Sequence, residues 1–450
     1  MLTRNSFRKT KDSPALNAVP RTAISAADLA AGTSALSTYF KAGAKPRDKW
    51  RIGFELEQLI VDRDNFTVPF AGDRGITAVL DRLSPLYDRR ITADAHDPTN
   101  PLIGLERADG TITLEPGAQF EFSSRPFKDL REVAAVWGNY QEELRAILSI
   151  FDYTALDIGY QPRTLVTDIT ILPKQRYEMM NQHFATTGKH GMNMMRGTAS
   201  TQVAIDYSSE ADAVAKMRVA AALTPLLALL TDNTPIFEGA PVRNYIKRTA
   251  IWNDVDAARS MIPPGLFSPG YEFADYARHV LTAPIIVIDV DGISQSTGSK
   301  GAIECYDVHN LALADIDHIL SMFFFDVRLR NYVEIRCADS VPFPYALAYL
   351  ALLKGIFYNE QNLSELGTLV QNFDNSSVPK IKAAIIADGY DADVTAYYGK
   401  PIQTMMFDLI ERAQKSLHVI NPEEAVYLEL FKPLVQEKTT LAREAQNELL

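Results

Sequence analysis

The stretch "RIGFELEQLIVD", residues 51–62, most constrains how this chain can fold. As a β-strand it places Ile52 and Phe54 on one face and Glu55 and Glu57 on the other, because successive side chains alternate. The apolar face has to be covered, whereas two neighbouring carboxylates on the opposite face repel each other unless water or a cation lies between them. The stretch therefore predicts a sheet with one packed face and one acidic face.

A second acidic segment, "GTITLEPGAQFEFSS" at residues 110–124, predicts a β-hairpin that turns at Pro116 and Gly117. Its alternation puts Glu115 and Glu121 on the same face. As diagonal neighbours across the hairpin they would lie roughly 7–8 Å apart at the backbone. We expect their carboxylates to converge on an ion between them.

Two further segments repeat the pattern of one apolar and one polar face. "TASTQVAID", residues 198–206, places Gln202 on its polar face, and "NYVEIRCAD", residues 331–339, places Glu334 and Arg336 there. Together with helical segments along the chain, the four strands predict an α+β fold. They form a curved antiparallel sheet whose concave side is a polar site.

The acidic residues of these strands have two interpretations. For any single strand, a solvated sheet surface is the simpler one. Surface strands, however, usually carry Thr, Lys and Ser outward, and here Glu dominates without interleaved Lys. Hard oxygen ligands suit Mg²⁺ or Mn²⁺, so we favour a site for two or more such ions. The carboxylates in question are Glu55, Glu57, Glu115, Glu121 and Glu334.

No glycine-rich phosphate loop and no zinc-binding histidine spacing is present in the sequence. A bound nucleotide would therefore depend on metal ions and arginines. The segment 242–267 offers Arg248 and Arg259 around Trp252, and arginines grip carboxylates and phosphates with two parallel hydrogen bonds. From composition alone, a surface loop with salt bridges explains this segment equally well.

Domain organisation is predicted as one large unit. We expect a flexible tail over residues 1–24, a mixed strand and helix region over 25–360, and an all-helical extension over 361–450. No Pro-, Gly- or Ser-rich linker separates these parts, which favours one α+β unit over several domains. The basic N-terminus also suits an organelle transit peptide, although a disordered tail is the interpretation we prefer.

Composition narrows the partners and the compartment. The formal charge of −11 argues against a nucleic-acid binder, and the most apolar stretch, residues 219–230, is too short to span a membrane and contains a proline. The two cysteines, Cys305 and Cys337, are predicted to be free thiols. They fit a reducing, cytoplasmic location.

Six motifs carry a resemblance to a known family, and they are "RIGFELEQ", "GTITLEPGAQFEFSS", "PKQRYEMM", "ASTQVAID", "KRTAIWNDVDAARSMIPP" and "DVRLRNYVEIRCAD". They occur in the order found in the plant and bacterial type of glutamate–cysteine ligase, which the chain resembles over roughly residues 50 to 345. "VEIRCADSVPFPYALAYLALL" more distantly resembles glutamine synthetase. The resemblance implies a catalytic domain over 25–360 with a funnel-like antiparallel sheet. It also implies ATP-dependent activation of L-glutamate as γ-glutamyl phosphate, which the amine of L-cysteine attacks in the first step of glutathione-type thiol synthesis.

The resemblance also implies roles for individual residues. Metal ligands would be Glu55, Glu57, Glu115, Glu121 and Glu334, with Arg336, Arg248 and Glu334 at the reacting groups. Substrate contacts would be Arg248, Arg259, Arg336, Trp252 and Gln202, and the nucleotide would contact Gln202 and Lys174. Both a monomer and a homodimer are compatible with the sequence.

The chain departs from the sequence motifs of the family at positions where substrates should bind. "RCADSVP" stands where relatives read like "RGADGG", Gly197 stands where many carry an arginine, and "WNDVDAARS" lacks a usual proline. The amine acceptor therefore stays open, and a ligase that joins glutamate to another amine is the second hypothesis. A non-catalytic nucleotide-binding regulator is the third, which is disfavoured because none of the five carboxylates is replaced.

Overall fold

A computed structural model of the chain describes residues 24–93, 100–290 and 293–449. The predicted tail lies outside the described residues, except for Ile24.

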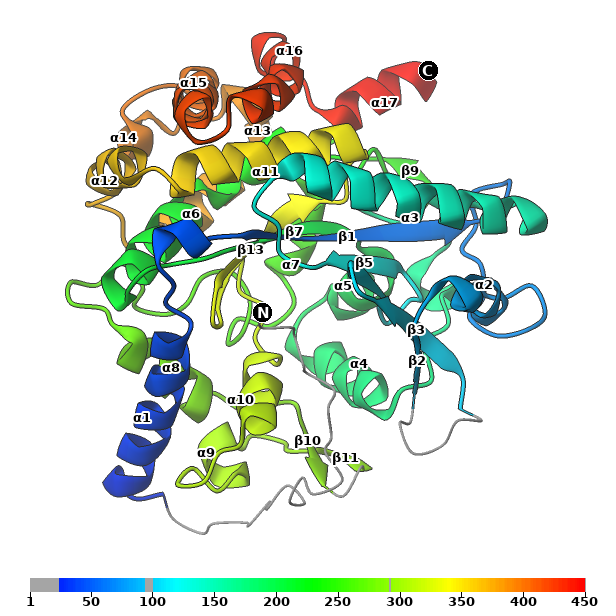
Figure 1. The fold of residues 1–450 in the computed structure, drawn as a ribbon, viewed down its shortest axis with the longest axis horizontal. Coiled ribbons are helices and arrows are strands. Elements are labelled where there is room, and N and C mark those ends of the chain that lie inside the picture. The colour runs from blue at the N-terminus through cyan, green and yellow to red at the C-terminus, as the bar shows by residue number, and fades with distance from the viewer. Residues whose placement is uncertain (1–23, 94–99, 291–292, 450) are drawn as a thin grey trace.

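One antiparallel sheet of nine strands organises the molecule (Figure 1). Eight strands follow the order β12-β13-β7-β1-β5-β4-β3-β2, and β6 pairs with the far end of β1. The strands are β1 (Ile52–Val61), β2 (Arg89–Thr92), β3 (Leu102–Arg107), β4 (Gly110–Leu114), β5 (Phe120–Ser124), β6 (Thr154–Leu156), β7 (Ser200–Ile205), β12 (Val327–Leu329) and β13 (Val333–Asp339). The four predicted strand regions are confirmed as β1, the β4–β5 hairpin, β7 and β13, and they lie together in the sheet.

Sequence patterns did not indicate every strand. β2, β3, β6 and β12 were not predicted, since each is short or lacks a clear alternation. Strand β10 (Val287–Val290) pairs with β11 (Ile293–Ser296) in a hairpin separate from the main sheet. Another small hairpin joins β8 (Ile236–Phe237) to β9 (Ala240–Pro241).

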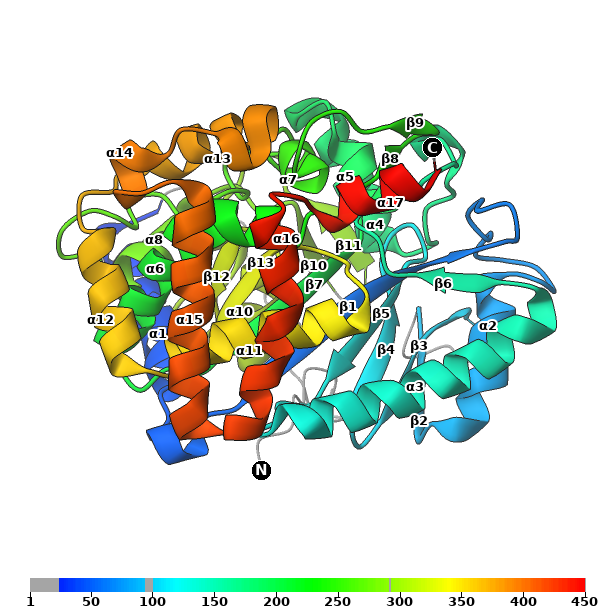
Figure 2. The ribbon, with the colours of Figure 1, turned by 90° about the horizontal axis from the view of Figure 1, so that it is seen from above.

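Helices α3 (Leu130–Phe151) and α11 (Phe343–Phe357) cover the apolar face of the sheet (Figures 1 and 2). The ring of Trp137 on α3 stacks on Phe343 of α11 at 5.2 Å and meets Phe54 of β1 edge-on at 5.5 Å. Such aromatic contacts add to the free energy gained by burying the rings. The packed face that the alternation predicts is thus formed by residues that lie far apart in the sequence.

Helix α6 (Glu210–Leu230) packs beside β13 and begins after Ser209, whose hydroxyl accepts a hydrogen bond from the Asp212 amide. By length and composition α6 is apolar enough to cross a membrane, yet 89% of its apolar window is buried inside the fold. It is therefore a core helix.

The remaining helices occupy the opposite side of the sheet and the C-terminal part. Figure 1 shows α4, α8 and α10 across the sheet from α3 and α11. In the first region they are α1 (Ala26–Ala42), α2 (Ile76–Leu83), α4 (Gln175–Thr187), α5 (Gly191–Gly197), α7 (Lys247–Trp252), α8 (Phe273–Thr282), α9 (Ala302–Cys305) and α10 (Leu313–Leu320). The C-terminal part has α12 (Glu360–Leu369), α13 (Ser377–Asp388), α14 (Thr395–Tyr398), α15 (Ile402–Ile420), the 3₁₀-helix η5 (Pro422–Leu430), α16 (Phe431–Gln436) and α17 (Leu441–Leu449).

A buried ion pair fastens the C-terminal helices to the sheet layer. Lys354 Nζ of α11 donates to both carboxylate oxygens of Glu424 in η5, at 2.5 and 2.7 Å. Glu424 also accepts the Leu130 amide of α3, and Lys354 donates to the Lys128 carbonyl oxygen. The proposed domain boundary at residue 360 stays a prediction, but these contacts join residues on its two sides.

We expect Glu424→Gln to lower the free energy of unfolding by about 3 kcal/mol, because it leaves the Lys354 ammonium buried without its counter-ion. Chemical denaturation measures the loss. The neighbouring Glu423 is exposed and pairs with Arg131 on the surface, so Glu423→Gln is the matched control and should change stability by less than about 1 kcal/mol. Equal effects of the two substitutions would contradict a role for the buried pair.

Candidate active site

Strand register gathers the acidic side chains on the face opposite the aromatic core. Glu57 of β1 lies directly across from Glu121 of β5, and Glu55 lies across from Gln202 of β7. Because residues two apart share a face, all four side chains project from the same side of the sheet. The predicted acidic face therefore exists on the three central strands.

Glu115 sits just after β4, where its amide donates to the Gln119 carbonyl oxygen at 3.0 Å. Thr113 pairs with Glu121, so Glu115 is the diagonal neighbour of Glu121, as predicted. The Gln119 side chain holds the turn between them. The Gln119 side chain accepts the Gly117 amide at 2.8 Å and donates to the Thr198 carbonyl oxygen at 2.9 Å.

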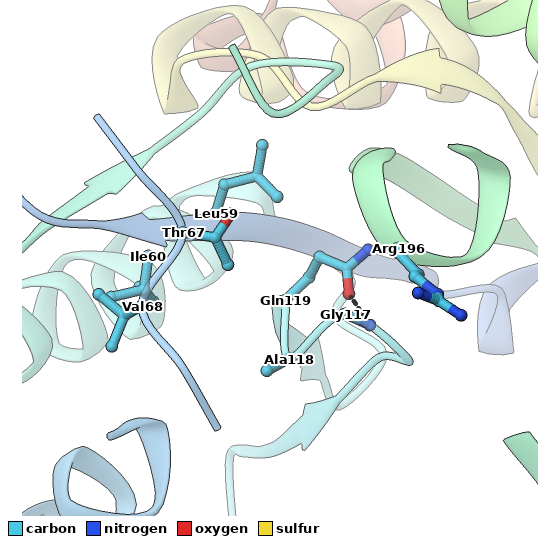
Figure 3. A pocket seen from close by; sticks show the side chains of 8 residues that line it. All are labelled: Leu59, Ile60, Thr67, Val68, Gly117, Ala118, Gln119 and Arg196. Carbon is cyan, nitrogen blue, oxygen red and sulfur yellow. Dashed lines mark hydrogen bonds between the residues drawn. The ribbon is translucent and has the colours of Figure 1, made fainter. Parts of the chain in front are cut away.

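At Gly117, in this turn, the surrounding backbone leaves no space for a side chain. A Cβ there would lie 2.3 Å from the carbonyl oxygen of Arg196. Figure 3 shows the turn, with Gln119 reaching back to Gly117, beside Arg196 and across a small hollow from β1. The close approach of the turn to α5 thus fixes the direction in which the hairpin presents its acids.

Neutral donors hold two of the carboxylates. Glu57 is 8% exposed, and one of its oxygens accepts the Ser200 amide at 2.8 Å. Its other oxygen accepts the Ser200 hydroxyl at 2.8 Å and the Gln202 side-chain amide at 3.1 Å. Glu121 accepts the hydroxyl groups of Thr113 and Ser123 at 2.9 and 3.1 Å.

Burial and mutual repulsion disfavour the ionised form of these groups. Burial, followed by the negative charge of Glu115, raises the pKa of Glu57 to about 7. Burial and the neighbouring glutamates also raise the pKa of Glu121 well above its usual range. Burial raises the pKa of Glu115 too, although Lys174 and Arg336 offset part of that effect. The carboxylates of the acidic face are therefore disfavoured in their ionised form unless a positive charge is added beside them.

The donor set consists of carboxylate oxygens, which fit Mg²⁺ or Mn²⁺. Within residues 24–93, 100–290 and 293–449, however, no three His, Cys, Asp or Glu side chains lie close enough to enclose an ion. Glu57 turns to β7 and Glu121 to hydroxyl groups of its own hairpin. Convergence of the acids on an ion stays a prediction, and the repulsion among them is what such an ion would relieve.

Glu334 of β13 is held differently. It accepts hydrogen bonds from Arg328 Nε at 2.6 Å and from a terminal nitrogen of Arg336 at 3.1 Å. Burial alone would raise the pKa of Glu334, but the two guanidinium groups outweigh burial and hold it below its usual value. Arg328 was not predicted, although it lies directly across from Glu334 in the β12–β13 pair.

Arg336 and Arg248 lie beside the acids. Arg336 donates to the Gln202 side-chain oxygen, which links β13 to β7. Arg248 of α7 is 4% exposed and donates to the Arg336 carbonyl oxygen at 3.3 Å. Its guanidinium lies 5.5 Å from the Trp252 ring centre. The buried Arg248 Nε and Trp252 indole N–H have no hydrogen-bond partner among the described residues.

These groups border a small hollow at the end of β13. A ligand with a carboxylate would provide acceptors for their unpaired N–H groups, which are otherwise costly to bury. The hollow is lined by Arg248, Thr249, Trp252, Phe324, Asp326, Arg336 and Cys337.

Lys174 and Arg176 supply positive charge from the start of α4. Burial lowers the pKa of Lys174 to about 8, and the nearby charges of Glu115 and Glu121 act in the opposite direction. Arg176 was not predicted; it donates to the Ser321 hydroxyl at 2.9 Å, and its charge acts on Glu115. The "KQR" spacing, with two cations on alternate residues, was the signal available in the sequence.

Arg259 is committed elsewhere. It is 1% exposed, and its Nε donates to Asp256 at 2.6 Å while a terminal nitrogen donates to the Pro284 carbonyl oxygen. A carboxylate oxygen of Asp256 also forms a hydrogen bond with His183 Nε2 at 2.8 Å. The structure thus gives Arg259 partners inside the protein, whereas the sequence placed it among the substrate contacts.

Comparisons with known proteins agree with this geometry. A family model described as glutamate–cysteine ligase family 2 matches residues 51–385. Chloroplastic glutamate–cysteine ligase B of Oryza sativa subsp. japonica is 31% identical over 361 residues, which cover 79% of this chain and 72% of the relative. The chloroplastic enzyme of Arabidopsis thaliana is 28% identical over 414 residues, or 90% of this chain and 78% of the relative.

A solved structure shares the fold. The glutamate–cysteine ligase of Francisella tularensis, in complex with AMP, superposes with a TM-score of 0.53 at 11% identity and covers 86% of this chain and 82% of that one. At this identity the likeness shows the fold alone. The sequence comparisons carry the family assignment, and the chain belongs to glutamate–cysteine ligase family 2.

Proposed function

We propose that the protein is an ATP-dependent ligase that joins the γ-carboxylate of L-glutamate to the amine of L-cysteine through γ-glutamyl phosphate. Family membership supports the reaction class. The observation that carries the proposal is the crowded acidic face with Arg336 and Arg248 beside it. Such an arrangement suits two anionic reactants that have to be brought together.

Glu55, Glu57, Glu115 and Glu121 would hold the divalent cations, Mg²⁺ or Mn²⁺. They come from β1, β5 and the end of β4, so more than one ion fits this spread better than a single one. Bound cations would neutralise the triphosphate and the attacking carboxylate, which otherwise repel each other. Lys174 and Gln202, at two edges of this face, are proposed to contact the nucleotide, and Arg176 adds positive charge next to Lys174.

Arg336 is proposed to bind glutamate or the transferred phosphate. One terminal nitrogen of Arg336 donates to both Glu334 and Gln202, which orients the guanidinium. Because Glu334 is already paired with two arginines, we propose that it positions Arg336, and a role as a metal ligand would require it to exchange a partner.

Arg248 is proposed to bind a substrate carboxylate with Trp252 beside it, since its buried Nε has no acceptor in the described part of the chain. Arg259 is left out of the proposed site because Asp256 and Pro284 accept hydrogen bonds from two of its three guanidinium nitrogens.

A reducing location, the cytoplasm, is proposed for the protein. Cys305 and Cys337 are free and buried, and burial raises the pKa of Cys337 to about 12, which keeps the thiol protonated and unreactive. Cys337 also lines the hollow beside Arg248, within the "RCADSVP" segment that departs from the family text. This observation favours the second candidate function, a ligase that joins glutamate to a different amine.

Phosphate release from ATP with Mg²⁺ and glutamate, measured against a panel of amino acids, tests the proposed reaction. Cysteine should stimulate release and give γ-glutamylcysteine by mass, and 2-aminobutyrate should substitute for it. Activity should disappear on chelation of divalent cations and return with Mg²⁺ or Mn²⁺. Stimulation by another amine and not by cysteine would favour the second candidate, and no glutamate-dependent release at all would contradict both.

We expect Arg336→Lys to lose nearly as much kcat/KM as Arg336→Ala, because an ammonium cannot reproduce the planar fork. The expected loss is roughly 30- to 1,000-fold, or about 2–4 kcal/mol of transition-state stabilisation. Arg89 on β2 is exposed and pairs with Glu106 outside the site, so Arg89→Lys serves as the control and should leave kcat/KM unchanged. A fully active Arg336→Lys enzyme would show that only the charge matters.

Glu121→Gln tests whether the acids are held together by cations. Without divalent cations the substitution should stabilise the protein by about 1–2 kcal/mol, because it removes an acid whose ionised form is disfavoured by burial and by the neighbouring glutamates. With Mg²⁺ and ATP present, the rise in melting temperature should be smaller in the variant than in the wild type. Glu411→Gln, at an exposed position that pairs with Lys415, should change neither quantity. A metal-free variant less stable than the wild type would instead indicate a structural role for Glu121.

A further inference from the structure

The segment from Pro235 to Ile246, called the strap below, leads directly into the helix that carries Arg248. It contains the β8–β9 hairpin, followed by residues 242–246 with no helix or strand. Backbone carbonyl groups in such a segment have no partner from a regular element and need donors from elsewhere. The strap ends at Ile246, which has a φ of 44° and no side-chain cap for α7.

Helix α17 supplies donors to the strap. Arg443 and Gln446 donate to four of its carbonyl oxygens, those of Pro235, Val242, Arg243 and Asn244. Figure 2 shows α17 beside β8 and β9.

The two side chains act as a pair. Arg443 donates to Val242 at 3.1 Å and to Asn244 at 3.5 Å, while Gln446 donates to Val242 at 2.8 Å and to Pro235 at 2.6 Å. Arg443 also donates to the Gln446 side-chain oxygen at 3.0 Å, which holds the two together. The guanidinium thus forms a fork over three consecutive carbonyl groups, a geometry that an ammonium cannot reproduce.

Helix α17 is itself fixed to the core. The Ala442 amide donates to the Asp232 carbonyl oxygen at 3.0 Å, and the Thr440 hydroxyl donates to the Asp232 carboxylate at 3.1 Å, just after the end of α6. The anchor therefore runs from a core helix through α17 to the strap.

Tyr245 adds a further contact from the C-terminal part. Its ring lies 4.5 Å from the Arg443 guanidinium, and its amide donates to the Ile386 carbonyl oxygen at 3.0 Å. A Cβ on Gly389 would come within 2.5 Å of the Tyr245 ring, so the ring packs directly on that backbone. Elements α13 and α17 therefore hold the strap from more than one direction.

Arg248 depends on this support because its own anchoring is weak. Helix α7 has only six residues, and within the described part of the chain the Arg248 side chain makes a single long hydrogen bond, to the Arg336 carbonyl oxygen at 3.3 Å. Asn244, the last carbonyl that Arg443 reaches, is separated from Arg248 by three residues. A shift of the strap would consequently be passed to the guanidinium.

We propose that Arg443 and Gln446 are positioning residues for Arg248, which fix the strap and so hold that guanidinium at the substrate carboxylate. The inference rests on the proposed function of Arg248 as a carboxylate ligand. It assigns the last described helix, nearly 200 residues away in sequence, to substrate binding.

Steady-state kinetics of the full-length enzyme provide the first test. Arg443→Ala and Gln446→Ala should raise the KM of the amino-acid substrate bound by Arg248 about 5- to 30-fold, as expected for the loss of one or two hydrogen bonds, with the KM for ATP within twofold of wild type. Arg443→Lys should recover only part of the loss. Lys432 pairs with Glu429 in its own segment, so Lys432→Ala is the matched control and should leave all constants unchanged. An equal rise of both KM values, or none, overturns the proposal.

A double-substitution cycle separates positioning from a general structural effect. If Arg443 acts through Arg248, Arg443→Ala should cost less than twofold in kcat/KM when Arg248 is already Lys. A loss in that background equal to the loss in the wild type overturns the proposal.

Hydrogen–deuterium exchange gives a readout that does not depend on turnover. In Arg443→Ala, and more mildly in Gln446→Ala, amides of residues 242–248 should exchange faster while those of β1 and β7 keep their wild-type rates. Unchanged exchange in the strap, or faster exchange throughout the chain in both variants, overturns the proposal. If the wild-type protein shows no ligase activity, the proposed function fails, and this measurement still decides whether α17 fixes the strap.

Discussion

Repulsion among the carboxylates of one sheet face is the constraint on which the rest of the structure depends. Glu55, Glu57 and Glu121 are held on adjacent strands by main-chain register, and Glu115 is held by a turn that packs on α5. The opposite face compensates with a dense aromatic core under α3 and α11. Hydrophobic burial on one side of the sheet thus stabilises an arrangement on the other side that would be unfavourable alone.

Charge changes sign across the sheet. The strands β1 and β5 and the end of β4 carry glutamates, whereas β12 and β13 bring Arg328 and Arg336 to Glu334. Gln202 on β7 lies between the two zones and contacts both, since it donates to Glu57 and accepts from Arg336. A phosphate held by metal ions would therefore lie in the acidic zone of this face, whereas a free carboxylate would lie in the basic zone. That separation matches a reaction in which phosphate is transferred between them.

Alternation in the sequence predicted the acidic face because the two-residue period of a strand fixes which side chains share it. The diagonal relation of Glu115 to Glu121 followed from the turn position alone. Arg328 was not predicted because β12 has three residues, too few to show alternation. The pairing of Arg259 with Asp256 could not be predicted because it depends on burial, which composition does not reveal, and a substrate contact of Arg259 stays a prediction. The docking of α17 on the strap is likewise set by long-range contacts and not by local periodicity.

The strand order has a consequence for how the protein folds. Central strand β1 pairs on one side with β5 and on the other with β7, so Glu55 meets Gln202 only after a loop of nearly 150 residues has closed. Strand β13, more than 100 residues further along, then has to add to β7. Contacts so distant in sequence slow folding, because chain entropy is lost before they form. The acidic hairpin and β1 are closer in sequence and can associate earlier, whereas β7 and β13 complete the site only after the longer loops have closed.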